Sequence, residues 1–126
     1  MATLSTINTP ALVLDRAIAA RNMARMQGYL ASVAPGVLFR PHLKTAKSIA
    51  VADMLFDGAR LPITVSTLKE AELFGAAGFT DILYAVGLSP QKIAAVQVLR
   101  EQGINLTVVT DNVAMANAIL KAAGAK

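Results

Sequence analysis

The sequence contains no cysteine, no tryptophan and a single histidine, His42. The absence of cysteine excludes a disulfide framework, a thiolate zinc site and a cysteine nucleophile. A lone histidine also excludes a zinc site built mainly from histidines, so we expect no metal site within this chain. Aromatic residues form only 5% of the sequence, and the stacking platforms that bind single-stranded nucleic acids depend on aromatic residues.

The length and hydropathy fit one small domain. The chain has 126 residues, of which 55% are hydrophobic, and its mean hydropathy is +0.52. This composition excludes a disordered chain, which would need low hydrophobicity and high net charge. Residues 1–14 are uncharged, but polar residues interrupt them and no positive charge precedes an apolar core. They fit neither a secretory signal nor a membrane-spanning helix, so we expect a cytoplasmic protein with no membrane partner.

The positive charge is concentrated in the first half of the chain. Residues 1–60 carry seven Lys and Arg against three Asp and Glu, whereas residues 61–126 carry five of each. A cationic half can attract nucleic acid, a membrane surface or an anionic small molecule. Because the sequence has no run of Lys or Arg and few aromatic residues, we expect no nucleic-acid partner.

Short apolar runs alternate with helical patterns along the chain, which predicts βαβ units and a parallel sheet. We expect helices to begin at Asp15, Ser89 and Asp111, and at Thr67 in a capping box with Glu70. The first helix carries an apolar stripe at Ala19, Met23, Met26, Leu30 and Val33. The expected strands cover residues 11–14, 37–44, 63–66, 82–86 and 106–109, and the expected helices cover residues 15–33, 46–57, 67–78, 89–103 and 111–126.

Two architectures share this pattern, a doubly wound nucleotide-binding sheet and a (β/α)₈ barrel. The glycine-rich phosphate motifs of the first are absent, and Gly75 and Gly78 are better explained by a helix end. A complete barrel needs roughly 250 residues, so the barrel alternative predicts about half a barrel with two open edges. Open edges would drive self-association, and we expect a homo-oligomer. The apolar residues expected to lack partners on the inner face are Leu38, Val65, Leu83 and Val108.

The segment most suggestive of chemistry is residues 40–48, which follows an apolar run and precedes a helix. In a strand, alternate residues point to one side, so Arg40, His42 and Lys44 share a face. Pro41 and Leu43 take the other face. In a barrel the basic face would point inward and end at the carboxyl-terminal rim, where barrel active sites lie. A crowded, partly desolvated lysine favours its neutral amine, which can form a Schiff base with an aldehyde.

Structural roles are alternatives for each of these residues. His42 could be a hydrogen-bonded packing residue, and Arg40 could pair with Asp53 or Asp57. Lys44 could be a solvated rim residue. We expect Lys47 to lie on the helix side and to be solvated.

Residues 40–48, Arg-Pro-His-Leu-Lys-Thr-Ala-Lys-Ser, resemble the R-P-H-x-K-T-x-K motif of the D-threonine aldolase and D-serine dehydratase family. The resemblance extends to residues 9–15, 21–22, 64–72 and 81–84 and so covers nearly the whole chain. Members of that family are pyridoxal-phosphate enzymes with an alanine-racemase-type N-terminal barrel. By this resemblance, residues 1–126 form about half of that barrel, residues 11–14 join a second domain, and the C-terminal β-domain is absent.

The resemblance implies that Lys44 holds pyridoxal phosphate as an internal aldimine. It also places His42 among the catalytic residues and Arg40 among those that bind the cofactor. Family members cleave β-hydroxy-D-amino acids or dehydrate D-serine-like substrates, so a lyase acting on a small D-amino acid is implied. Many members bind a divalent metal, through a part of the protein that is not among these residues. A pyridoxal-phosphate homeostasis protein and a non-catalytic half-barrel fragment are the alternatives.

Overall fold

The computed structural model describes residues 3–124, which divide after Val37 into two compact units. Each unit is described by itself below. The first contains the 3₁₀ turn η1 (Leu4–Thr6) and helix α1 (Arg16–Val33). The elements of the second are, in chain order, α2 (Ile49–Phe56), β1 (Ile63–Val65), α3 (Leu68–Ala76), β2 (Asp81–Gly87), the 3₁₀ turn η2 (Pro90–Lys92), α4 (Ile93–Glu101), β3 (Asn105–Val109) and α5 (Val113–Ala122).

In the first unit, the predicted helix is confirmed and the predicted strand is wrong. The Asp15 side chain accepts a hydrogen bond from the N–H of Ile18 and so caps α1 as expected. Residues 11–14 form no strand, and Leu12 is fully exposed. A strand exists only where a partner accepts its backbone hydrogen bonds, and no described residue pairs with this segment. None of the α1 side chains is fully buried, and of its apolar stripe Ala19, Met23 and Leu30 are half-buried while Met26 and Val33 are exposed.

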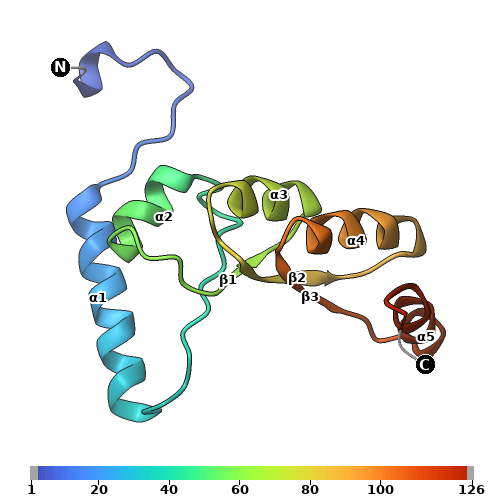
Figure 1. Ribbon diagram of the computed structural model, residues 1–126. Helices are drawn as coiled ribbons and strands as arrows, with labels where there is room; N and C mark the ends of the chain where they lie inside the picture. The colour runs from blue at the N-terminus through green and yellow to red at the C-terminus, as the bar shows by residue number, and fades with distance from the viewer. Residues whose placement is uncertain (1–2, 125–126) are drawn as a thin grey trace. The chain divides into compact units, whose positions relative to one another are not determined.

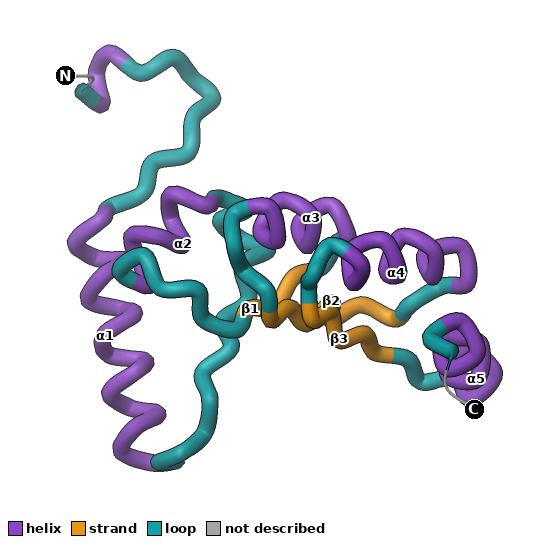
Figure 2. The backbone as a smooth tube through the Cα atoms, viewed as in Figure 1, coloured by secondary structure: helices purple, strands orange, loops and turns teal. Residues whose placement is uncertain are grey.

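The second unit is built on a parallel sheet with strand order β1-β2-β3. Each strand therefore lies beside its neighbour in the sequence, as Figures 1 and 2 show. Parallel crossovers are right-handed, and such crossovers between sequential neighbours place every connecting helix on one face. Helices α3 and α4 do contact each other and lie on the same side of the strands. This singly wound order differs from that of a doubly wound sheet, whose helices cover both faces.

The core lies between the sheet and these helices. The strand residues that face the helices are completely or almost completely buried, and the T-shaped ring pair of Phe74 and Phe79 packs with them, its centroids 5.6 Å apart. Burying each large apolar side chain contributes about 1.5–3 kcal/mol. The buried strand residues are Ile63, Val65, Ile82, Tyr84 and Leu106.

Of the apolar residues expected to lack partners, Val65 is the clear error. Val65 is fully buried on the helix side of the sheet, whereas Leu38 is 81% exposed as expected. Leu83 and Val108 are half-buried. The register pairs Val65 with Tyr84 and Thr64 with Leu83, so Thr64 and Leu83 occupy the face opposite the core.

The start of α3 was predicted correctly, whereas α2 was expected two residues too early, because Ser48 caps it by accepting from the N–H of Val51. Thr67 accepts from the N–H of Glu70, and α3 begins at the next residue. The last cap was misplaced by one residue, because Asn112 rather than Asp111 accepts from the N–H of Met115. Ser89 makes no side-chain cap, and Pro90 opens η2 before α4 begins at Ile93. Residues 125 and 126 of the last predicted helix lie outside the described residues.

Gly75 and Gly78, which the sequence pattern assigned to a helix end, have different roles. Gly78 adopts a φ of +90° just after α3, a conformation that disfavours any residue with a Cβ. Gly75 lies inside α3, where an added Cβ would clash with the side chain of Ile104. Close packing against Ile104 therefore explains Gly75, and neither glycine forms a phosphate loop.

Candidate active site

The predicted strand at residues 37–44 is reduced to a single parallel bridge beside β1, between His42 and Thr64. The N–H of Thr64 donates to the Pro41 carbonyl (2.8 Å), and the N–H of Leu43 donates to the Thr64 carbonyl (2.9 Å). Pro41 has no N–H for a longer ladder, and the chain enters a turn at Lys44. The segment 40–44 is therefore a minimal edge strand.

Side chains alternate along this edge strand as the sequence predicted. Leu43 is 5% exposed and belongs to the core, whereas His42 and Lys44 are exposed. The His42–Thr64 bridge places His42 in one row with Thr64, Leu83 and Thr107 across the sheet. The face opposite the helices is thus largely polar at the edge where Lys44 lies.

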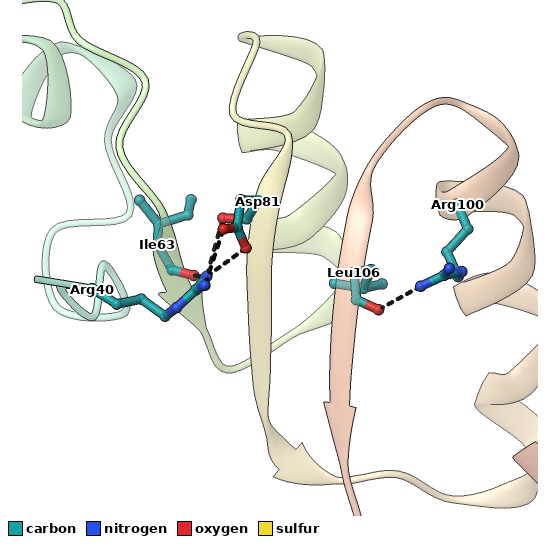
Figure 3. Close-up of polar contacts among 5 residues, drawn as sticks. All are labelled: Arg40, Ile63, Asp81, Arg100 and Leu106. Atoms are coloured by element: carbon teal, nitrogen blue, oxygen red, sulfur yellow. Dashed lines mark hydrogen bonds and ion pairs between the residues drawn. The ribbon is translucent and has the colours of Figure 1, made fainter. Parts of the chain in front are cut away.

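Arg40 lies at the other end of the edge strand, and both of its terminal nitrogens make hydrogen bonds. Its Nη1 and Nη2 donate to the two carboxylate oxygens of Asp81, at 2.8 and 3.1 Å. Nη1 also lies 3.3 Å from the carbonyl oxygens of Ile63 and Asp81, as Figure 3 shows. Ile63 and Asp81 begin β1 and β2, so Arg40 joins the amino ends of these strands.

The two acids named as alternative partners of Arg40 were the wrong ones. Asp53 pairs instead with Arg60, at 2.7 Å. Asp57 is the residue that ends α2, in a left-handed conformation. Asp81 is 41 positions from Arg40 in the sequence, and parallel pairing of β1 with β2 brings the two together.

His42 makes hydrogen bonds through both ring nitrogens. Its Nδ1 accepts from the backbone N–H of Lys44 at 3.2 Å, and its Nε2 lies 3.3 Å from the Ser66 hydroxyl. Because the Lys44 amide can only donate, Nδ1 must carry a lone pair. The hydrogen-bond network therefore assigns the neutral tautomer with its proton on Nε2, which donates to Ser66 Oγ.

Lys44 has an exposed side chain just beyond the edge strand. Among the described residues, no hydrogen bond or ion pair involves its Nζ. The turn that begins at Lys44 is closed by the N–H of Lys47, which donates to the Leu43 carbonyl at 2.9 Å. Lys47 itself has a φ of +46°, a left-handed conformation that costs roughly 1–2 kcal/mol in a residue other than glycine.

The sequence predicted that Lys47 is solvated, but in the structure its side chain also forms an ion pair. Its Nζ lies 3.2 Å from Oε1 of Glu70, whose side chain is only 7% exposed. The other carboxylate oxygen of Glu70 accepts from the N–H of Ser66 at 2.8 Å. Burial alone would raise the pKa of Glu70, but this N–H, the Lys47 ammonium and the N–H of Thr67 together hold its pKa below the ordinary value.

Sequence reasoning missed Ser66 and the second contact of Glu70. A capping box predicts a contact of Glu70 with the N–H of Thr67, but Glu70 also accepts from the N–H of Ser66, one residue further back. The signal for Glu70 was present, since an acid in the first turn after a strand lies at the carboxyl end of a parallel sheet. The sequence could not show that the turn of residues 44–47 lies against Glu70.

The part of the chain that the structure describes holds no group of three His, Asp or Glu residues that could bind a metal ion. Within that same part, no helix has the length and apolar character needed to cross a membrane.

The sequence is similar to several curated enzymes, although no protein-family profile matches it. It is 50% identical over 117 residues to D-threo-3-hydroxyaspartate dehydratase of Delftia sp. (strain HT23), a match that covers 93% of this chain and 30% of that enzyme. It is 32% identical over 115 residues to D-serine dehydratase of Dictyostelium discoideum, covering 87% of this chain and 28% of the relative. The chain fits the N-terminal portion of the D-threonine aldolase and D-serine dehydratase family.

Solved structures of the family agree with the fold described above. The Delftia D-threo-3-hydroxyaspartate dehydratase superposes with a TM-score of 0.89 at 45% identity, covering 99% of this chain and 33% of that chain. An alanine racemase-like protein from Idiomarina loihiensis gives 0.88 at 41% identity, covering 96% and 32%. D-Threonine aldolase from Filomicrobium marinum gives 0.80 at 27% identity, again covering 96% and 32%.

The chain spans only about 30% of the length of the curated relatives it matches. A variant of the Delftia dehydratase has been solved in what its description calls the metal-free form.

Proposed function

We propose that this chain supplies the cofactor lysine of a pyridoxal-phosphate-dependent lyase that acts on small β-hydroxy-D-amino acids. The observation that carries the proposal is the unpaired Nζ of Lys44, exposed on a polar strand face beside a neutral histidine. The relatives are dehydratases and aldolases, named for D-serine, D-threonine or hydroxyaspartate. Their names favour elimination or aldol cleavage, two reactions that begin by breaking a bond at the same carbon of the substrate.

The residues present fit an aldehyde cofactor. An amine without a partner can hold an aldehyde covalently with the release of water, and Lys44 is the lysine of this face that has no ion pair. Pyridoxal phosphate, when bound, withdraws electrons from the carbon next to the substrate nitrogen. The protein's part is to fix where that carbon lies.

The neighbours of Lys44 have separable roles in the proposal. Nδ1 of His42 accepts a hydrogen bond from the backbone N–H of Lys44, and its Nε2–H donates to the hydroxyl of Ser66. These two hydrogen bonds fix the orientation of the ring. We assign to His42 a catalytic role in which it keeps a proton beside the reacting groups. Arg40 was expected to bind the cofactor, but both of its terminal nitrogens are committed to Asp81. We therefore propose that Arg40 positions the edge strand, which in turn positions Lys44.

We further propose that the edge strand, β1, β2 and β3 are neighbouring strands of a (β/α)₈ barrel of the alanine-racemase type. Support comes from the sequential strand order, from the helices on one face and from the polar character of the opposite face. In this arrangement residues 1–126 are part of one barrel domain. The remaining strands, a C-terminal β-domain with a divalent metal, and assembly as a homo-oligomer in the cytoplasm stay predictions for the whole protein.

Borohydride trapping followed by peptide mapping tests the cofactor lysine. The protein, purified with its complete reading frame, is loaded with pyridoxal phosphate, reduced and digested. We expect the pyridoxyl group on Lys44, and a label confined to Lys47 or Lys69 would contradict the proposal. Lys69 is a fair comparison, because it is 82% exposed on the first turn of α3.

Activity measurements test the reaction class. We expect D-configured β-hydroxy amino acids to be consumed and activity to fall after exhaustive chelation. Equal activity on L-threonine would argue against the assignment. A protein labelled at Lys44 that turns over no such substrate would instead behave as a pyridoxal-phosphate homeostasis protein, and one that takes up no label would be a non-catalytic fragment.

A further inference from the structure

Two lysines of the same turn, Lys44 and Lys47, are candidates for reaction with the aldehyde of the proposed cofactor. Lys44 and Lys47 are three residues apart, and both are exposed; the side chain of Lys47 is 61% exposed. Solvent access therefore does not explain why only one should react. The two lysines differ in that only Lys47 lies beside Glu70.

Glu70 is a buried acid that needs Lys47. Its Oε2 is satisfied by the N–H of Ser66, but no hydrogen-bond donor is aligned with its buried Oε1. The only cation beside that oxygen among the described residues is the Lys47 ammonium, 3.2 Å away. A buried carboxylate oxygen without compensation is costly, so the pair stays formed.

The backbone of Lys47 supports the same arrangement. Its left-handed conformation turns the chain so that Lys47 points back to the start of α3, while its N–H closes the turn on Leu43. Lys44, at the opposite corner of that turn, has an exposed side chain, and its backbone N–H donates to His42.

We propose that Glu70 is a selectivity residue: it holds Lys47 as a paired ammonium and so leaves Lys44 as the one lysine of this turn that reacts with the cofactor. This rests on the proposed function. In the reaction a free Nζ attacks the aldehyde carbon, a carbon–nitrogen double bond replaces the carbon–oxygen double bond, and the aldehyde oxygen leaves as water with the two protons of the amine. If Lys47 left Glu70 to make that attack, the buried Oε1 of Glu70 would have no cation beside it among the described residues.

The Glu70→Gln variant tests the proposal by label distribution rather than by activity. A glutamine still accepts from the N–H of Ser66 but no longer attracts the Lys47 ammonium. After loading and borohydride reduction we expect the share of pyridoxyl label on Lys47 to rise about tenfold, the factor for losing one charge-assisted contact. The Glu72→Gln variant is the matched control, because Glu72 pairs with Lys69 at 2.9 Å on the exposed side of α3.

The outcomes separate this inference from the proposed function. Label on Lys44 in the unmodified protein, unchanged in Glu70→Gln, would overturn the inference and leave the function standing. No label on Lys44 in the unmodified protein would overturn the function itself.

A measurement on the unmodified protein covers the case in which Glu70→Gln does not fold. Brief acetylation with a small amount of acetic anhydride, followed by mass spectrometry, ranks the lysines by reactivity. We expect Lys47 to react several-fold more slowly than Lys69, although both are exposed and both face a glutamate, because only Glu70 is buried. Equal rates would overturn the inference.

Discussion

The two ends of the segment 40–47 are held by ion pairs of different kinds. At the amino end of the sheet, Arg40 and Asp81 make a two-point contact, with side chains 30% and 38% exposed. At the carboxyl end, Lys47 and Glu70 make a one-point contact in which only the acid is buried. In the first pair, both charged side chains are engaged with each other. In the second pair, Lys47 lies three residues from Lys44, whose amine has no partner among the described residues.

This difference teaches where rigidity and reactivity are placed. In parallel barrels the amino-terminal end of the strands serves stability and the carboxyl-terminal end serves chemistry. In the barrel and the function proposed above, one segment of eight residues would do both, since it begins in a closed salt bridge and ends in an open turn. The ends should therefore respond to mutation in different measurements.

The largest effect is expected at the reactive end. Under the proposed function Lys44→Ala removes the amine that binds the cofactor, so we expect activity to fall by roughly 10³-fold or more, the scale of losing a covalent group. Its side chain has no partner among the described residues, so the thermal midpoint should be nearly unchanged. Calorimetry and turnover of a D-β-hydroxy amino acid check both expectations. Lys47→Arg, which keeps the charge beside Glu70, is the control and should retain most activity.

The opposite end should respond in stability. Arg40→Met leaves the Asp81 carboxylate and two strand carbonyls without their donor, and we expect a loss of about 1–2 kcal/mol in the free energy of unfolding. Urea unfolding measures the loss. Borohydride mapping should still place the label on Lys44. Lys69→Met breaks an exposed pair and should cost no more than about 0.5 kcal/mol. If Arg40→Met unfolds no more easily than Lys69→Met, the two ends are not different in kind.

A smaller effect concerns pH. The pKa of Glu70 is lowered in the folded protein, so its ionised form contributes stability that is complete above the ordinary pKa of a glutamate. That contribution is lost as the pH falls through the lowered value. We expect Glu70→Gln to cost about 1 kcal/mol near neutral pH and to flatten the acid side of the stability profile. Unfolding curves between neutral and strongly acidic pH check this. The same slope in both proteins would show that Glu70 does not couple to folding.

The smallest effect is expected at Ser66. Ser66→Ala removes the acceptor for the His42 Nε2–H, while Nδ1 keeps its contact with the Lys44 backbone. We expect a change of about 0.5 kcal/mol, or roughly twofold to threefold in kcat/KM. Ser66→Thr retains the hydroxyl and should restore the rate. If neither variant changes kcat/KM, the contact between Ser66 and His42 does not orient the histidine during the reaction.

The sequence was sufficient for local features and insufficient for distant partners. The N-cap of α3 at Thr67 and the exposure of His42 and Lys44 on either side of the buried Leu43 follow from spacing over a few residues, and both agree with the prediction. The partner of Arg40 was not, because Asp81 becomes its neighbour only when β1 pairs with β2. The lysine motif itself came from a resemblance rather than from periodicity.

The wrong strand at residues 11–14 has a related cause. Apolar runs of four residues are ambiguous, since the same pattern serves a strand, a buried helix segment or an extended connection. Residues 63–65 became β1 because the edge strand and β2 supply partners on both sides. Residues 11–14 have no such partner among the described residues. The side of the sheet that Val65 faces was predicted wrongly for the same reason, because the pairing with the neighbouring strand sets the register.

The alternation of side chains along residues 40–44 limits how this segment can change in length. Leu43 points into the core and Lys44 away from it, so neighbouring positions differ in the side of the sheet that they reach. A residue inserted between Arg40 and Lys44 would keep every chemical group yet turn the lysine toward the buried side. A deletion would do the same. Insertions and deletions here should therefore be far less tolerated than a replacement of Leu43 by another apolar residue of similar size.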